Sequence, residues 1–291
     1  MAKLRLQRKL KEKEVLYNFI YTLVDKKDFK TAKQFYDKLK PTGQHKSMLE
    51  VHLLRKITTD FTQENIQDLL NTFSINIKDL RFQCKINVQG DSLSFTATPI
   101  IMDVLKKIWE ENPDQAKSLF AFFVLKGLPL ESNESYNNAL IHTITKHPNN
   151  LEFIEMLLKQ GNLDTNALIT PDTDKTCKFA KTPFSVAISR LNEDLLLLLL
   201  KHGADPYLAI KSANKYMTAK QGKYKKYVMT SGLSTKGLSD EEQQDYFYKV
   251  NDLIEDFFLD KLIKEPTSAT QKSTRLEGKE AKSEKKEGKK L

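Results

Sequence analysis

The 291-residue sequence predicts an all-α fold, a helical solenoid with helical caps at both ends and a short β-hairpin near residues 82–97. Two observations predict it. Segments with the pattern helix, turn, helix and glycine recur at a spacing of roughly 40 residues, which is typical of stacked repeats. One of these segments contains six consecutive leucines, Leu195 to Leu200, in a chain whose residues are 29% charged. Because a helix that is apolar nearly all round must be buried, we expect these leucines to form the packed interior of the stack.

Residues 1–97 are expected to form a helical N-terminal cap region, because a stacked array needs atypical units at its ends. Apolar spacing predicts four helices there, over residues 4–24, 28–40, 46–58 and 62–73. From residue 82 to 97 the apolar residues alternate with polar ones, and Gly90 and Asp91 favour a turn. This pattern predicts a small hairpin or an extended loop.

Three helix–turn–helix segments follow, and the third, residues 181–206, is the clearest. Thr182 is expected to cap a short first helix, with Pro183 at the first helical position, where its missing N–H costs nothing. Asn192 is expected to cap the second helix, whose N-terminal turn carries two acidic residues. Gly203 is expected to follow that helix in the left-handed conformation.

The two earlier segments share this pattern. Residues 138–164 contain Asn150 as the expected cap of a second helix and Gly161 as its closing residue. In residues 98–130 the corresponding residues are Thr98, Pro99, Asn112, Pro113 and Gly127.

Residues 98–210 resemble the ankyrin repeat, most specifically in the last copy. There Thr182-Pro183-Phe184 stands where the family has T-P-L, and Ala187 where it has a helix alanine. The stretch LLLKHGADP matches the family's second-helix ending. The resemblance implies an ankyrin-like solenoid whose surface binds other proteins.

The chain also departs from the family pattern. Ser185 replaces the usual histidine, Leu191 replaces the usual glycine between the helices, and the earlier copies carry extra residues. The resemblance implies structural roles at the repeat positions Thr98, Pro99, Gly127, Gly161, Thr182, Pro183, Gly203, Ala204 and Asp205.

Residues 211–264 are expected to form a basic loop and a C-terminal capping helix. Ser239 and Glu242 form a capping-box pattern that opens a helix reaching about Lys264. Its apolar face is expected to dock on the last repeat. Residues 265–291 are rich in Lys, Glu, Ser and Gly, and we expect them to be disordered.

Motifs for catalysis, cofactors and metals are missing from the sequence. Its five histidines form no H-E-x-x-H pattern, and neither a Gly-rich phosphate loop nor a nucleophile elbow occurs. The cysteines, Cys84 and Cys177, form no C-x-x-C pair and indicate a reducing compartment. We therefore expect no enzyme activity, no cofactor and no metal. No apolar run approaches the roughly 18–20 residues of a membrane span, so a cytoplasmic monomer is expected.

The leading functional hypothesis is a non-catalytic protein–protein interaction module whose partner the sequence does not identify. Two polar loops, residues 128–137 and 163–181, join the repeats, and loops on a rigid scaffold are where binding residues concentrate. The residues predicted to contact a partner come from these loops and the last first helix: Glu131, Glu134, Tyr136, Asp172, Asp174, Lys175, Lys178, Ser185, Ser189 and Arg190.

Three other hypotheses stay open at this point. An enzyme active site would have to lie in residues 1–97 or 211–264. Residues 211–227 carry six lysines, three tyrosines and no acid, which suits phosphates and stacked bases, but the absence of arginine disfavours specific base recognition. Short, divergent ankyrin arrays also occur in effectors that intracellular bacteria deliver into host cells by type IV secretion, and a lysine-dominated chain is compatible with that group.

Overall fold

The structure is a computed structural model that describes residues 2–85, 92–170, 173–174, 181–208 and 239–264. It divides into two compact units, Met1–Thr235 and Lys236–Leu291. The described residues are mostly helical, with one two-stranded sheet. The predicted predominance of helix and the predicted hairpin are therefore both confirmed.

The first unit begins with four helices, α1 (Ala2–Asp25), α2 (Phe29–Leu39), α3 (Gly43–Leu54) and α4 (Gln63–Phe73). Asp28 caps α2 by accepting a hydrogen bond from the Thr31 amide, and Thr62 caps α4 in a capping box with Asn65. The prediction for α3 was wrong at both ends, since the helix begins at residue 43 and ends at 54. It ends early because the Lys56 and Ile57 amides bond to carbonyls three residues back, which tightens the chain into a turn.

The hairpin consists of β1 (Arg81–Lys85) and β2 (Ser92–Thr96), which pair antiparallel with Phe82 opposite Phe95. The two phenyl rings stack with centroids 5.3 Å apart. Such aromatic cross-strand pairs stabilise a short hairpin. The predicted turn at Gly90 and Asp91 lies outside the described residues.

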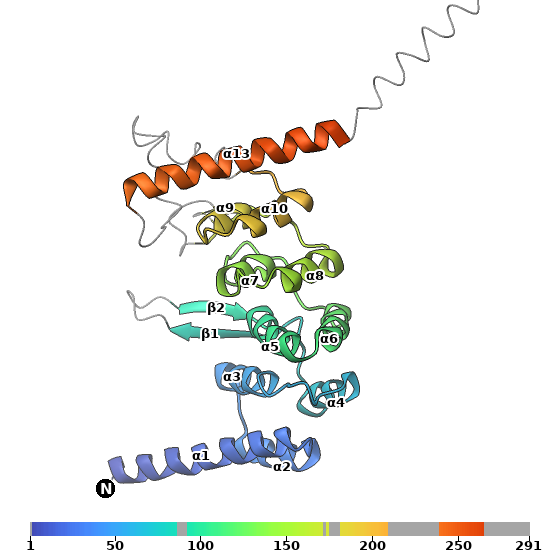
Figure 1. The fold of residues 1–291 in the computed structure, drawn as a ribbon. Helices are drawn as coiled ribbons and strands as arrows, with labels where there is room; N and C mark the ends of the chain where they lie inside the picture. The colour runs from blue at the N-terminus through green and yellow to red at the C-terminus, as the bar shows by residue number, and fades with distance from the viewer. Residues whose placement is uncertain (1, 86–91, 171–172, 175–180, 209–238, 265–291) are drawn as a thin grey trace, which may run out of the picture. The chain divides into compact units, whose positions relative to one another are not determined.

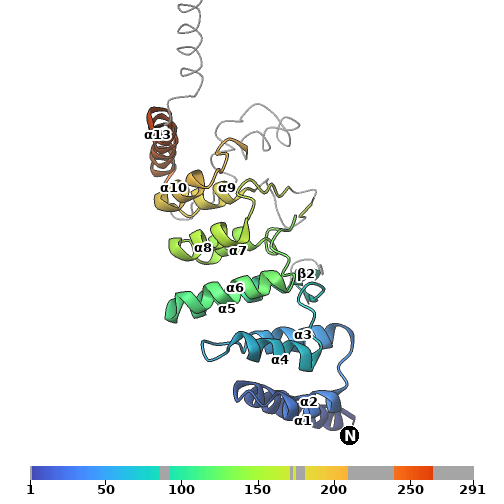
Figure 2. The same ribbon diagram turned by 90° about the vertical axis from the view of Figure 1, so that its right-hand side faces the viewer.

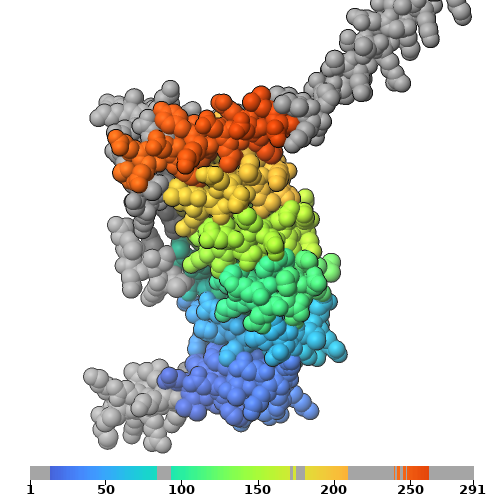
Figure 3. Space-filling view, in the orientation of Figure 1, coloured from blue at the N-terminus to red at the C-terminus, as the bar shows by residue number. Residues whose placement is uncertain are grey.

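Three helix pairs follow the hairpin. They are α5 (Thr98–Glu111) with α6 (Pro113–Leu125), α7 (Ala139–Lys146) with α8 (Leu151–Gly161), and α9 (Pro183–Ile188) with α10 (Glu193–Lys201). Within the first unit, α7 contacts both α5 and α9, and α8 contacts both α6 and α10, so the pairs lie in successive layers (Figures 1 and 2). Figure 3 shows the side chains of these layers in direct contact.

The predicted caps of the second helices are confirmed. The side chains of Asn112, Asn150 and Asn192 each accept a hydrogen bond from the amide three residues further on, with distances of 3.1, 3.3 and 3.0 Å. Each bond satisfies a donor that the first turn of a helix otherwise leaves without a partner. The same local device therefore begins the second helix in all three pairs.

The helix ends confirm two of the three predicted glycines. Gly127 and Gly203 have φ of +80° and +86°, the left-handed conformation that glycine adopts most easily. The prediction that Gly161 closes α8 in the left-handed conformation was wrong. Gly161 lies inside the helix, and Asn162 takes the left-handed position with φ +46°. A Cβ at residue 161 would lie 3.0 Å from the Phe120 ring, so glycine here permits close packing of α8 on α6.

The leucine run is buried along one broad side rather than all round. Leu195, Leu196, Leu199 and Leu200 are at most 4% exposed, whereas Leu197 and Leu198 are half-buried. This corrects the expectation of a helix enclosed on every side. It confirms that the run belongs to the core.

The second unit contains one described helix, α13 (Asp240–Lys264). Its predicted capping box is confirmed, since the Ser239 amide donates to the Glu242 carboxylate at 2.7 Å and the Glu242 amide donates to the Ser239 hydroxyl at 3.3 Å. Docking of this helix on the last repeat stays a prediction. The basic stretch 211–227 and the tail 265–291 lie outside the described residues.

Candidate functional site

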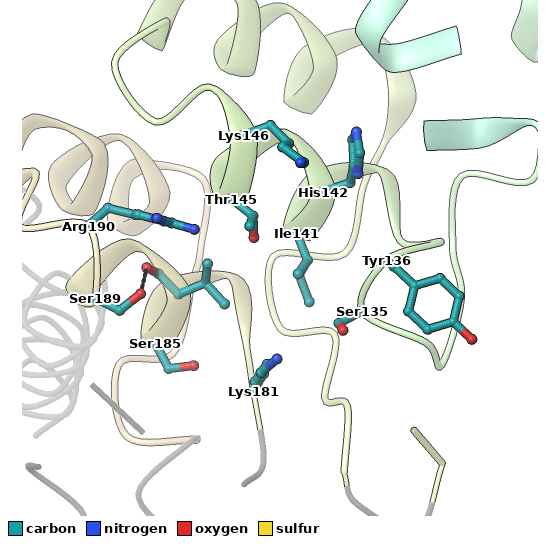
Figure 4. Close-up of a pocket in the computed structure, with 11 residues that line it drawn as sticks. Ser135, Tyr136, Ile141, His142, Thr145, Lys146, Lys181, Ser185, Ser189 and Arg190 are labelled. Atoms are coloured by element: carbon teal, nitrogen blue, oxygen red, sulfur yellow. Dashed lines mark hydrogen bonds between the residues drawn. The ribbon is translucent and has the colours of Figure 1, made fainter. Parts of the chain in front are cut away.

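A cleft of about 260 Å³ lies between the first helices of two successive pairs, α7 and α9 (Figure 4). Its walls come from α7, from α9 with its flanking residues, and from the loop that precedes α7. Ile141 and Val186 supply its apolar lining, and the rest is basic or hydroxyl-bearing. Those polar residues are Ser135, Tyr136, His142, Thr145, Lys146, Lys181, Ser185, Ser189 and Arg190.

Local hydrogen bonds fix the α9 side of the cleft. Thr182 caps α9 in a capping box, accepting from the Ser185 amide while its own amide donates to the Ser185 hydroxyl at 2.9 Å. At the other end of α9, the Ser189 hydroxyl donates to the Val186 carbonyl at 2.6 Å (Figure 4). The serines that line the cleft are therefore held in place by the helix they belong to.

The buried side chain of Asn137 fixes the loop side of the cleft. Its carbonyl oxygen accepts from the Thr96 amide at 2.9 Å, and its nitrogen donates to the Ser94 carbonyl at 2.9 Å and to the Glu134 carboxylate at 2.6 Å. Asn137 thus ties the loop before α7 to strand β2. The ring of Tyr136, which lines the cleft, packs against Phe95 of the same strand at 4.9 Å.

The cleft carries more positive than negative charge. None of Lys146, Lys181 and Arg190 forms a side-chain ion pair or hydrogen bond with any residue whose position is described. The nearby carboxylates are engaged within the fold, since Glu134 accepts from Asn137, and Asp174 accepts from the Ser135 hydroxyl at 2.8 Å. The cleft therefore presents three cations that have no ion-pair partner among the described residues.

His142 extends the site to the neighbouring layer through an acid on α5. Its Nε2 lies 3.0 Å from Asp103 Oδ1, and His147 Nε2 lies 3.5 Å from the same oxygen. Burial raises the pKa of Asp103, but the hydrogen bonds and charges of His142 and His147 outweigh it, so the pKa falls below its ordinary value. Burial lowers the pKa of His147 in spite of Asp103. Asp103 thus joins α5 to α7 through two histidines.

Four of the residues predicted to contact a partner line the cleft together, namely Tyr136, Ser185, Ser189 and Arg190. Glu131 lies apart from it and braces the loop, accepting from the Asp164 amide at 2.9 Å and from the Asn138 side chain at 3.0 Å. Asp174 was predicted to contact a partner, but it is only 2% exposed and its carboxylate accepts a hydrogen bond from the Ser135 amide. Glu134 does not line the cleft either; it is half-buried and accepts a hydrogen bond from Asn137. The remaining three predicted contacts, Asp172, Lys175 and Lys178, lie outside the described residues.

The predicted structural positions of the last pair lie where the pattern puts them. Thr182, Pro183 and Ala204 are buried. The Asp205 amide donates to the Asn166 side chain at 2.6 Å, and Asn166 donates in turn to the Gly203 carbonyl at 3.0 Å. Thr98 does not cap α5 as Thr182 caps α9, because Ala97 holds the N-cap position and Thr98 is the first helical residue; the Thr98 hydroxyl donates to the Pro129 carbonyl at 2.5 Å instead.

The sequence analysis missed Lys146 and Lys181, two of the cations in the cleft. A local signal was present, since Lys146 ends α7 and Lys181 immediately precedes the cap of α9. Because α7 and α9 contact each other, residues at the ends of both helices line the same cleft. His142 lies one helical turn before Lys146, and Thr145 directly precedes it.

The described residues of the cleft can bind a ligand but do not form a metal centre. Among the residues whose positions are described, no group of three or more His, Cys, Asp or Glu side chains is placed to hold a metal ion. The described lining of the cleft contains no cysteine and no carboxylate. In the same part of the chain, no helix has the length and apolar character that crossing a bilayer requires.

Comparison with known proteins finds no neighbour for this chain. No protein-family model matches it, and neither a curated protein nor a solved structure is significantly similar to it.

Proposed function

We propose that this chain is a non-catalytic protein-interaction module, built as an ankyrin-like solenoid, whose partner binds in the cleft between α7 and α9. Residues 98–210 supply the repeated unit, a short first helix, a turn and a second helix begun by an asparagine cap. The first helices of neighbouring pairs contact one another, as do the second helices. This neighbour-to-neighbour contact is the pattern of repeat proteins, which use their exposed surfaces for recognition.

The observation that carries the proposal is the convergence of Tyr136, Ser185, Ser189 and Arg190 on one cleft. They come from a loop and a helix that are far apart in the chain. An open, rigid cleft with an apolar floor and a polar rim has the composition of a recognition surface. Its described lining contains no carboxylate and no thiol.

The test is affinity capture from a cell lysate with the full chain, comparing two matched variants. Thr145→Trp places bulk in the cleft, and Thr72→Trp places the same bulk at a half-buried threonine of α4, away from the cleft. We expect a stoichiometric protein on the native chain and on Thr72→Trp but not on Thr145→Trp. Equal thermal unfolding of the two variants shows that both are folded.

Two results would overturn the proposal. If the native chain captures no stoichiometric protein, the proposal that it is an interaction module is wrong. Equal capture by both tryptophan variants would remove the cleft as its surface. Delivery into a host cell and the alternatives of an enzyme or a nucleic-acid binder stay predictions of the sequence.

A further inference from the structure

We infer that the cleft binds an acidic segment of a partner protein, with carboxylate side chains held by Lys146, Lys181 and Arg190. This inference rests on the proposed function, and it names the chemistry of the partner.

The three cations surround the cleft from both helices. Lys146 stands at the last turn of α7, Lys181 two residues before α9, and Arg190 two residues after it (Figure 4). Their side chains form no ion pair with the residues that the structure describes, although the chain has many acids. Cations that converge on one hollow without internal acids are typical of sites that recognise carboxylates or phosphates.

The nearby carboxylates form no ion pair with these three cations in the part of the chain that the structure describes. Asp103 is held by His142 and His147, Glu134 by Asn137, and Asp174 by Ser135. The described part of the chain therefore holds these carboxylates on other side chains and leaves the three cations without an ion-pair partner. An acidic ligand supplies the missing partner.

The apolar floor favours a peptide over a nucleic acid. Ile141 and Val186 are 2% and 8% exposed and lie between the cations. A peptide can place an aliphatic side chain on this floor while neighbouring carboxylates reach the basic rim. A nucleic acid needs a longer stripe of phosphate contacts than a cleft of about 260 Å³ provides.

The hydroxyl groups of Ser185 and Ser189 already donate hydrogen bonds within the protein. Ser189 donates to Val186, and Ser185 donates to the Thr182 carbonyl at 3.0 Å, so both hydroxyl hydrogens are used within α9. Anion binding therefore depends on the lysines and the arginine, which makes charge reversal the direct test.

The experiment measures fluorescence anisotropy with the full chain and three labelled probes. The probes are a short peptide alternating Glu and Asp around a central leucine, the matched peptide with Gln and Asn, and a single-stranded RNA. The triple variant Lys146→Glu, Lys181→Glu and Arg190→Glu is compared with Lys30→Glu, Arg55→Glu and Lys107→Glu, which reverses the same number of charges at exposed positions elsewhere.

We expect the acidic peptide to bind the native chain at least roughly tenfold more tightly than the Gln/Asn peptide, since a fully lost charge contact corresponds to about that factor. The cleft reversal should abolish this preference, and the control reversal should preserve it. Equal binding of both peptides, equal loss in both triple variants, or tighter binding of RNA would overturn the inference.

The lysate capture separates failure of this inference from failure of the proposed function. If Thr145→Trp loses the captured protein but the cleft reversal keeps it, the cleft binds a partner whose acidity is irrelevant, and only the inference fails. If both variants keep the protein, both proposals fail. Loss in both variants, with retention in Thr72→Trp and in the control reversal, supports both.

Discussion

Asp103 on α5 and His142 on α7 meet across the boundary between two helix pairs, with 3.0 Å between Oδ1 and Nε2. His147 reaches the same carboxylate oxygen from the end of α7. One side chain therefore links two layers, and the link contains titratable groups.

We expect the free energy of unfolding to fall as the pH is lowered from about 7.5 to 5.5, with His147 contributing to the loss. Burial lowers the pKa of His147 below its ordinary value near 6.5, so the folded chain binds fewer protons than the unfolded chain in this range. Stability then rises with pH and is lost as the pH falls through the ordinary value. Urea unfolding at both pH values should show a smaller loss for His147→Gln than for the native chain. An equal loss would remove His147 from the pH dependence.

Asp103 makes a separate prediction at neutral pH. Asp103→Ala removes the acceptor of His142, and we expect a loss of about 1 kcal/mol, since the carboxylate is partly exposed and solvent screens the interaction. The exposed Asp114→Ala variant of α6 is the control for removing a surface carboxylate. A loss no larger than that of the control would show that the link between layers contributes nothing to stability.

Leu191 should tolerate replacement by glycine with a gain in stability. Its φ of +53° places a branched side chain in the left-handed region, which costs an L-residue about 1–2 kcal/mol. Glycine avoids that cost but loses more chain entropy, so we expect Leu191→Gly to add about 0.5 kcal/mol in urea unfolding. Gly203→Ala, at φ +86° with open space around its Cβ position, should show the opposite sign. Destabilisation by Leu191→Gly would contradict the argument.

Two leucines of the α10 run should respond differently to truncation. Leu199 is fully buried, so Leu199→Ala should cost about 2–5 kcal/mol through lost burial and the cavity left behind. Leu197 is half-buried, and Leu197→Ala should cost less than half as much. Urea midpoints at unchanged slope measure both. Equal costs would show that the two sides of α10 are equally enclosed.

Asn137 should control how firmly the hairpin holds the cleft. Asn137→Ala removes the side chain that bonds to Thr96, Ser94 and Glu134, and we expect a loss of about 2–3 kcal/mol because Asn137 is only 1% exposed. Hydrogen exchange at the Thr96 amide, which donates to Asn137, should accelerate strongly. Asn133→Ala, at an exposed position of the same loop, should leave that amide unchanged. Unaltered exchange in Asn137→Ala would show that the strand is held by other contacts.

Features specified by adjacent residues could be predicted from the sequence. An asparagine cap, a Thr-Pro helix start and a glycine after a basic last turn each act within a few residues, and they were correct at Asn112, Asn192 and Gly203. Gly161 was misassigned because its purpose is the approach of Phe120 from another pair, and only tertiary packing shows that. From the sequence alone, a glycine that ends a helix in the left-handed conformation cannot be distinguished from one that allows close packing.

The cleft was predictable in part for the same reason. Ser185, Ser189 and Arg190 belong to one short stretch whose exposed side follows from helical spacing. Lys146 and Lys181 reach the cleft from different elements, so their meeting depends on how α7 and α9 stack. The contact between Asp103 and His142 also joins residues of two different helix pairs, so no local sequence pattern predicts it.

The asparagine caps also bear on how the chain can be made. Each second helix is begun by a residue directly before it, and the contacts between the described pairs join pairs that are neighbours in the sequence. Most of the interactions that form one layer therefore lie within a few dozen residues. A helix pair that has left the ribosome can form most of its own contacts. The next pair is then needed to cover its apolar side. Synthesis from the N-terminus and assembly of the layers can therefore proceed in the same order.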